Sequence, residues 1–82
     1  MNKVQKEKLE DYLSGLEDLK NLPFSYLGAI IADKKDKEEI LEFIKNKKTL
    51  DKKILILEEE EYNNLKPSFK KNITSVCRLI SL

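Results

Sequence analysis

The sequence contains no histidine, and this absence excludes several kinds of catalytic site. Without an imidazole there is no Ser-His-Asp or Cys-His arrangement, no histidine general base and no histidine metal ligand. The chain also has only two glycines, Gly15 and Gly28, so it lacks a glycine-rich loop that could hold phosphates. We therefore expect a protein that is not an enzyme and that needs no cofactor.

Cysteine is almost absent too, because Cys77 stands alone and no disulfide can form within the chain. This usage fits a reducing compartment. With no histidine to act as a base, Cys77 is expected to be a buried, unreactive thiol. No apolar run approaches the roughly 18 residues of a membrane span, and residues 1–8 lack the apolar core of a signal peptide. These absences predict a soluble, cytoplasmic protein without membrane contact.

Net charge is nearly absent as well. The 16 basic and 15 acidic residues leave a formal charge of +1. This balance argues against duplex DNA or an anionic membrane as a bulk electrostatic partner. A length of 82 residues predicts a single domain, 1–82, with a thin core and modest stability unless the chain associates.

What the chain does contain is a run of four aliphatic residues, 54–57, followed directly by four glutamates. A short continuous aliphatic run is typical of a strand covered on both faces. We interpret it as the central strand of a sheet, emerging into solvent at its C-terminal end. Two further apolar runs, 24–32 and 72–80, are predicted as the first and last strands.

Helical periodicity separates these runs. Residues 3–20 are predicted as one helix, with a weak point at Gly15, and residues 59–65 and 67–71 as two short ones. The strongest helical pattern covers residues 36–48, where Asp36 is the expected N-cap and Glu39 stands at capping-box spacing. The expected buried face of this helix comprises Ile40, Leu41, Phe43 and Ile44.

The predicted order is therefore α-β-α-β-α-β. It indicates a small three-layer α/β domain with a three-stranded parallel or mixed sheet. Gly28 counts slightly against the first strand and marks a bulge or a close approach. The alternative is a mostly α fold in which residues 23–48 are helical, begun by Pro23.

The four glutamates form what we call the acidic ridge, Glu58, Glu59, Glu60 and Glu61. Ligands of open α/β sheets bind beyond the carboxyl ends of strands, which is where this ridge is expected. It is a candidate partner-binding surface. Adjacent glutamates point in different directions, so only Glu58 or Glu59 together with Asp33 or Asp36 could share a metal ion. The plain alternative is a solvated helix start.

A lysine-rich end is expected at the opposite end of the sheet, before the second and third strands begin. It forms a second candidate surface, for a protein or for nucleic acid. The lack of arginine there, and of aromatic residues between the lysines, argues against nucleic acid. The lysines assigned to this basic end are Lys47, Lys48, Lys52, Lys53, Lys70 and Lys71.

The last candidate is an apolar stripe on the first helix. Its spacings of three and four residues predict that it covers one face of the sheet. Alternatively it docks a partner helix or a second copy of the chain, because two heptads are too few for a coiled coil alone. The stripe comprises Leu9, Tyr12, Leu16 and Leu19.

These features together predict a small protein-binding module, such as an inhibitor, an antitoxin or immunity-type factor, or an accessory subunit. It would act by protein–protein contact, possible self-association included. Two alternatives stay open. One is a nucleic-acid-binding accessory protein that uses the basic end, and the other is a carboxylate metal-binding domain.

Overall fold

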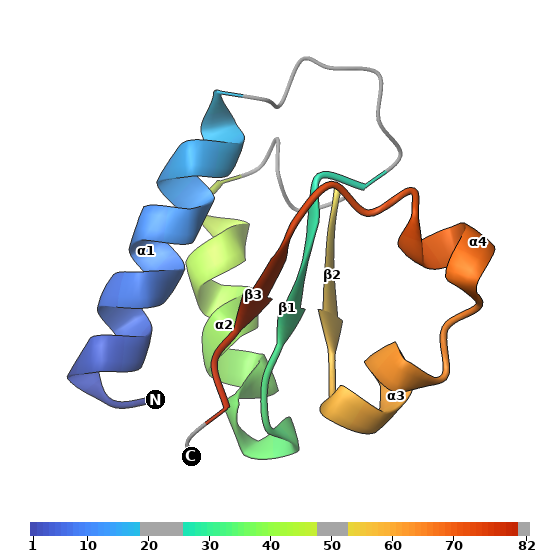
Figure 1. The fold of residues 1–82 in the computed structure, drawn as a ribbon. Helices are drawn as coiled ribbons and strands as arrows, with labels where there is room; N and C mark the ends of the chain where they lie inside the picture. The colour runs from blue at the N-terminus through green and yellow to red at the C-terminus, as the bar shows by residue number, and fades with distance from the viewer. Residues whose placement is uncertain (19–25, 48–52, 81–82) are drawn as a thin grey trace.

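The computed structural model describes residues 1–18, 26–47 and 53–80, and these form three layers. A parallel sheet lies in the middle, with two helices on each side of it (Figure 1). In chain order the elements are α1 (Lys3–Glu17), β1 (Gly28–Ile31), the 3-10 turn η1 (Lys34–Asp36), α2 (Lys37–Lys45), β2 (Ile54–Leu57), α3 (Glu59–Asn63), α4 (Pro67–Lys70) and β3 (Val76–Arg78). The predicted α/β class and element order are confirmed.

The three strands run parallel in the order β2-β1-β3. The chain leaves β1, crosses one side of the sheet through α2 and returns as β2. It then crosses the other side through α3 and α4 to reach β3 (Figure 1). Of the predicted parallel or mixed sheets, the parallel one is therefore present. The mostly α alternative is wrong, because residues 28–31 inside the proposed helix 23–48 form a strand.

The strand formed by residues 54–57 is not central, and this prediction is wrong. Neighbouring strands lie on both sides of β1, whereas β2 lies at an edge of the sheet. All four residues of β1 are buried, but in β2 only Ile54 is buried and residues 55–57 are half-buried. A continuous aliphatic run indicates that both faces receive some cover, and an edge strand between two helical layers meets that condition too.

The main core lies between the sheet and the helices α1 and α2, and we call this half of the molecule the packed side. Every side chain in its centre is almost fully removed from solvent. Pairing of Ile30 with Ile56 and with Cys77 places these three side chains on the same face of the sheet. The buried residues of the cluster are Leu9, Leu13, Leu16, Leu27, Ile30, Ala32, Ile40, Ile44, Ile54, Cys77 and Leu79.

Helix α1 begins with a capping box that the sequence analysis did not name. The Gln5 backbone N–H donates to Asn2 Oδ1, and the Asn2 N–H donates to Gln5 Oε1, both at 2.8 Å. The helix then continues through Gly15 as one element to Glu17, and Asp18 is its C-cap. The predicted end of this helix at residue 20 lies outside the described residues.

Gly28 marks a close approach, as predicted. A Cβ at this position would lie 1.8 Å from the hydroxyl oxygen of Tyr12. That hydroxyl lies 2.9 Å from Ser75 Oγ and 3.2 Å from the Ser75 carbonyl oxygen, to which it donates. Tyr12 thus joins α1 to the chain just before β3, across a surface that only glycine leaves open.

The start of α2 differs from its prediction. Asp36 is the N-cap, but its side chain makes no capping hydrogen bond, because the preceding turn η1 leaves its backbone helical. The amino group of Met1 instead lies 3.3 Å from Asp36 Oδ1 and 2.9 Å from Glu39 Oε2. The predicted capping box is therefore wrong, since both carboxylates bind the amino group. Leu41, expected on the buried face, is 42% exposed.

Candidate functional site

The side of the sheet covered by α3 and α4 is incompletely closed, and we call it the open side. The two helices are five and four residues long, and neither contributes a buried residue. The register places Leu55, Leu57 and Val76 on this side, together with the fully buried Ala29 and Ile31. Leu55 and Leu57 remain half-buried, and Val76 is 38% exposed. Apolar surface of the sheet thus stays in contact with solvent here.

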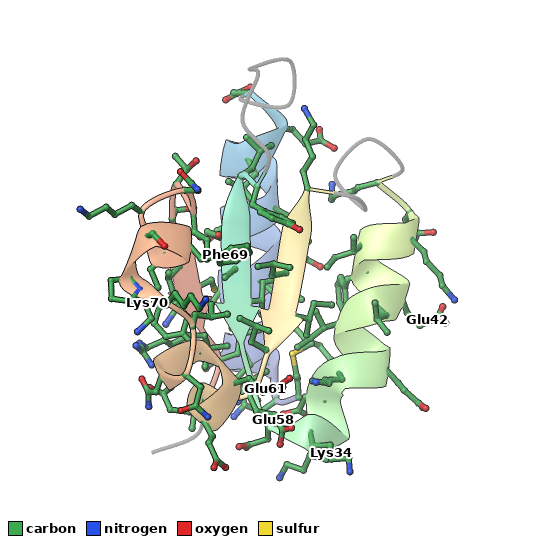
Figure 2. The ribbon with its side chains drawn as sticks, turned by 90° about the vertical axis from the view of Figure 1, so that its right-hand side faces the viewer. Lys34, Glu42, Glu58, Glu61, Phe69 and Lys70 are labelled. Carbon is green, nitrogen blue, oxygen red and sulfur yellow. The ribbon has the colours of Figure 1, made fainter. Side chains whose placement is uncertain are left out.

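Aromatic rings and cations carry the contacts of the open side. The rings of Tyr26 and Phe69 lie 5.6 Å apart, centre to centre. Lys70 Nζ lies 4.8 Å from the ring centre of Tyr62, and the guanidinium carbon of Arg78 lies 5.6 Å from the same centre. Figure 2 views this side and shows Phe69 and Lys70 on α4. None of these side chains is buried, so the contacts lie at the surface of the molecule and do not form a closed core.

The acidic ridge forms the start of α3, and much of its charge is used locally. Glu58 is the N-cap, and its N–H donates to Glu61 Oε1 at 3.0 Å in a capping box. Glu61 also pairs with Lys37 Nζ at 3.1 Å, and Glu59 pairs with Arg78. The Glu58 N–H and then Lys37 hold the pKa of Glu61 below its ordinary value. Of the four glutamates, only Glu60 has no polar partner among the described residues.

The ridge and the loop after β1 lie at the same end of the molecule, as Glu58, Glu61 and Lys34 show in Figure 2. Their carboxylates nevertheless do not converge. Across the described ranges, no group of three or more His, Cys, Asp or Glu side chains is placed to hold a metal ion. Asp36 instead binds the Met1 amino group. The structure therefore lends no support to the carboxylate metal-binding alternative.

The basic end is distributed over both sides of the sheet. Lys47, just after α2, pairs with Glu17 of α1 at 3.6 Å. Lys70 belongs to α4 on the open side and lies over Tyr62, and Lys71 follows it. Lys53 directly precedes β2. Lys48 and Lys52 fall outside the described residues, so the basic end as a whole stays a prediction.

The apolar stripe of α1 covers the sheet, in line with the first of its two interpretations. Leu9 and Leu16 are buried and Tyr12 is half-buried, while Leu19 lies outside the described residues. Docking of a partner helix would need these side chains at the surface. Cys77 is buried opposite them, as predicted, and burial raises the pKa of its thiol. The stripe and the thiol both serve the core in this structure.

A groove that the sequence analysis missed runs along the outer edge of β3, between α1 and α3. It consists of two adjacent hollows of about 380 and 530 Å³, which share Lys8 and Arg78. We call it the β3 groove. Among the described residues it is lined by Lys8, Tyr12, Glu59, Tyr62, Val76, Cys77, Arg78 and Ile80.

Two of these residues are cations, and one of them, Arg78, is paired with Glu59 of the same lining. Lys8 Nζ donates to the Arg78 carbonyl oxygen at 2.8 Å, and the Arg78 side chain lies on the opposite wall against Tyr62. In the sequence, Lys8 belongs to the polar face of α1, and such a face is expected to be ordinary solvated surface. The sequence therefore did not single out Lys8. Arg78 is the one arginine of the sequence, and this was the only feature of the sequence that could have drawn attention to the groove.

Comparisons with protein-family models, with curated proteins and with solved structures found no match for this chain. The described part of the chain contains no helix with the length and apolar character needed to cross a bilayer. The candidate site therefore depends on the geometry of the open side and the β3 groove.

Proposed function

We propose that the chain is a small protein-binding module whose partner docks on the open side of the sheet. The observation that carries this proposal is the exposure of sheet residues that α3 and α4 fail to bury. Val76, the first residue of β3, is 38% exposed, and no residue of either short helix is buried. An inhibitor, an antitoxin or an accessory subunit would each act through contact of this kind.

The chemistry of the open side supports protein as the partner. Tyr, Phe and Arg dominate the energetic centres of protein interfaces, because each offers a large contact area with few rotatable bonds or a planar fork of donors. Tyr26, Tyr62, Phe69 and Arg78 supply these groups around the half-buried Leu55 and Leu57. Glu60 has no polar partner within the part of the chain that the structure describes, and its charge would steer a partner more than hold it.

A matched pair of variants tests the proposal. Val76→Glu places a charge on the open side, and Leu41→Glu places one on α2, at positions of similar exposure, 38% and 42%. The immobilised wild-type chain is incubated with a lysate of its source cells, and the retained proteins are identified. Each variant is first checked for a cooperative unfolding transition.

The proposal expects a protein that binds the wild-type chain and Leu41→Glu but is lost from Val76→Glu, because a buried, unpaired charge would oppose docking. Reconstitution of the complex from two purified components, with the same order of affinities, completes the test. Retention of no protein at all, or equal loss in both variants, would contradict the proposal.

A further inference from the structure

We propose that the β3 groove binds an extended, acidic peptide segment of the partner, which adds to the sheet as a fourth strand beside β3. This inference rests on the proposed function and names the mode of contact. Three features carry it, namely an edge of β3 that no described strand pairs with, a groove of suitable length, and the ammonium group of Lys8 inside that groove.

The outer edge of β3 is unpaired. The Ala29 N–H donates to the Ser75 carbonyl at 3.0 Å, and the Leu79 N–H donates to the Ile31 carbonyl at 2.7 Å. Backbone groups alternate in direction along a strand, so those of Val76 and Arg78 point away from β1. Within the described residues no strand pairs with this edge. Unpaired N–H and C=O groups of this kind recruit an extended peptide.

The groove fits such a peptide. Its two hollows follow the chain from Val76 to Ile80, which corresponds to about 17 Å of extended backbone. Tyr12 of α1 lines one wall and Tyr62 of α3 the other. Alternate side chains of an added strand would therefore meet one aromatic ring on each side, which provides pockets for specificity.

The charge of Lys8 selects an acidic segment, because Arg78 is already paired with Glu59, which also lines the groove. Lys8 makes no ion pair with the described residues, and its ammonium group lies on the outward carbonyl of Arg78 at 2.8 Å. A backbone N–H of the incoming peptide would take over that carbonyl. Lys8 would then be released toward a carboxylate on the peptide, and the new hydrogen bond would be charge-assisted. A neutral peptide offers Lys8 no comparable partner.

The test begins with selection of random-sequence peptides, displayed on phage, against the wild-type chain. The expected peptides carry an acidic residue within a β-branched or aromatic stretch. Val76→Pro removes one outward N–H and leaves the ladder to β1 unchanged, whereas Val76→Ala keeps the N–H and shortens the side chain. We expect Val76→Pro to weaken binding by at least about tenfold, because ladder hydrogen bonds are lost, and Val76→Ala to weaken it less.

Lys8 provides the charge arm. Lys8→Met should weaken the selected acidic peptides by about tenfold and reduce their advantage over versions in which Gln replaces the acidic residue. Lys3→Met, an exposed position five residues earlier on α1, is the matched control and should change neither quantity. Amide exchange followed by NMR adds the structural readout. Bound peptide should protect the Val76 and Arg78 amides, while the Cys77 amide is protected with or without it.

Several results would overturn the inference. They are the selection of no peptide, equal binding to wild type and Val76→Pro, or bound peptides that leave the Val76 and Arg78 amides unprotected. Light scattering that shows a dimer dissociated by Val76→Pro would assign the edge to a second copy instead. If the cellular partner is lost from Val76→Glu but retained by Val76→Pro, this inference fails while the proposed function stands.

Discussion

The two sides of the sheet are covered by helices of unequal length, and this inequality organises the molecule (Figure 1). On the packed side, α1 and α2 are 15 and 9 residues long and bury five leucine and isoleucine side chains. On the open side, α3 and α4 are 5 and 4 residues long and bury none. Side chains of a strand alternate between the two faces of the sheet, so both faces need cover. The two faces are buried to different extents because the helices over them differ in length.

The stabilising interactions differ in kind as well. Apolar burial on the packed side contributes about 0.8 kcal/mol for each CH₂ group removed from water. The open side depends on a capping box, exposed ion pairs such as Lys37–Glu61, and ring contacts, each of which contributes a smaller amount. The packed side therefore holds the fold together, and the open side is closed only weakly.

The largest expected effect comes from equal truncations on the two sides. Leu13→Ala on the packed side should lower the free energy of unfolding by about 3 kcal/mol, because it leaves a cavity in a closed core. Leu57→Ala on the open side should cost about 1 kcal/mol, because this half-buried site can relax into solvent. Urea unfolding measures both. Equal losses would remove the distinction between the two sides.

The next effect sharpens the account of how α1 is fixed to the packed side. Gly28→Ala should destabilise by about 2 kcal/mol, because the new methyl group collides with the Tyr12 hydroxyl. Tyr12→Phe alone should cost about 1 kcal/mol through the lost hydrogen bonds to Ser75. The double variant should lose less than the sum of the two, by about 1 kcal/mol. Additive losses in urea unfolding would show that the hydroxyl is not the obstacle.

A smaller effect, an increase in stability, is expected at Gly15, which serves as a reference because it packs against neither face of the sheet. A Cβ at Gly15 would meet nothing within 4 Å, and the residue lies inside α1. Gly15→Ala should therefore raise the free energy of unfolding by about 1 kcal/mol through helix propensity alone. A loss of stability at this exposed position would mean that α1 does not continue through residue 15.

The smallest effect concerns pH and the open side. The pKa of Glu61 in the folded chain lies below its ordinary value, through the Glu58 N–H first and Lys37 next. Ionised Glu61 therefore stabilises α3 above the ordinary glutamate pKa, and this contribution is lost as the pH falls through the lowered value. NMR titration of the Glu61 carboxyl carbon should show the low midpoint.

Two substitutions complete the pH test. Lys37→Gln should raise the Glu61 midpoint toward its ordinary value, and Lys35→Gln, with an exposed lysine that does not contact Glu61, should leave it in place. In the same acid range, amides of α3 should exchange faster while those of α1 do not. Acid loosening of both helices together would argue against a difference between the sides.

Much of the fold could be predicted because local signals agreed with it. Hydrophobic periodicity located α1 and α2, and Pro67 marked the start of α4. The order of the strands in the sheet could not be predicted. The aliphatic run 54–57 indicated a central strand covered on both faces, but β2 lies at an edge of the sheet. Leu41 shows the same limitation, because an amphipathic pattern gives the apolar arc of a helix but not the width that the sheet covers.

The candidate site could be predicted far less well, because it depends on contacts between distant segments. The acidic ridge was visible in the sequence, but its partners Lys37 and Arg78 were not. Asp36 was assigned to a cap, yet the amino group of Met1 occupies it. Lys8 and Tyr62 can be recognised as lining residues of the β3 groove only once β3 is known to be an edge strand between α1 and α3.

Native-state hydrogen exchange, measured by NMR over increasing denaturant, tests most directly whether one side holds the fold and the other is weakly closed. The account predicts that amides of α1 and α2 exchange only through global unfolding, whereas those of α3 and α4 exchange through smaller openings with a lower free energy. Equal exchange free energies and equal denaturant dependence in all four helices would contradict it, because the open side would then be as firmly closed as the packed side.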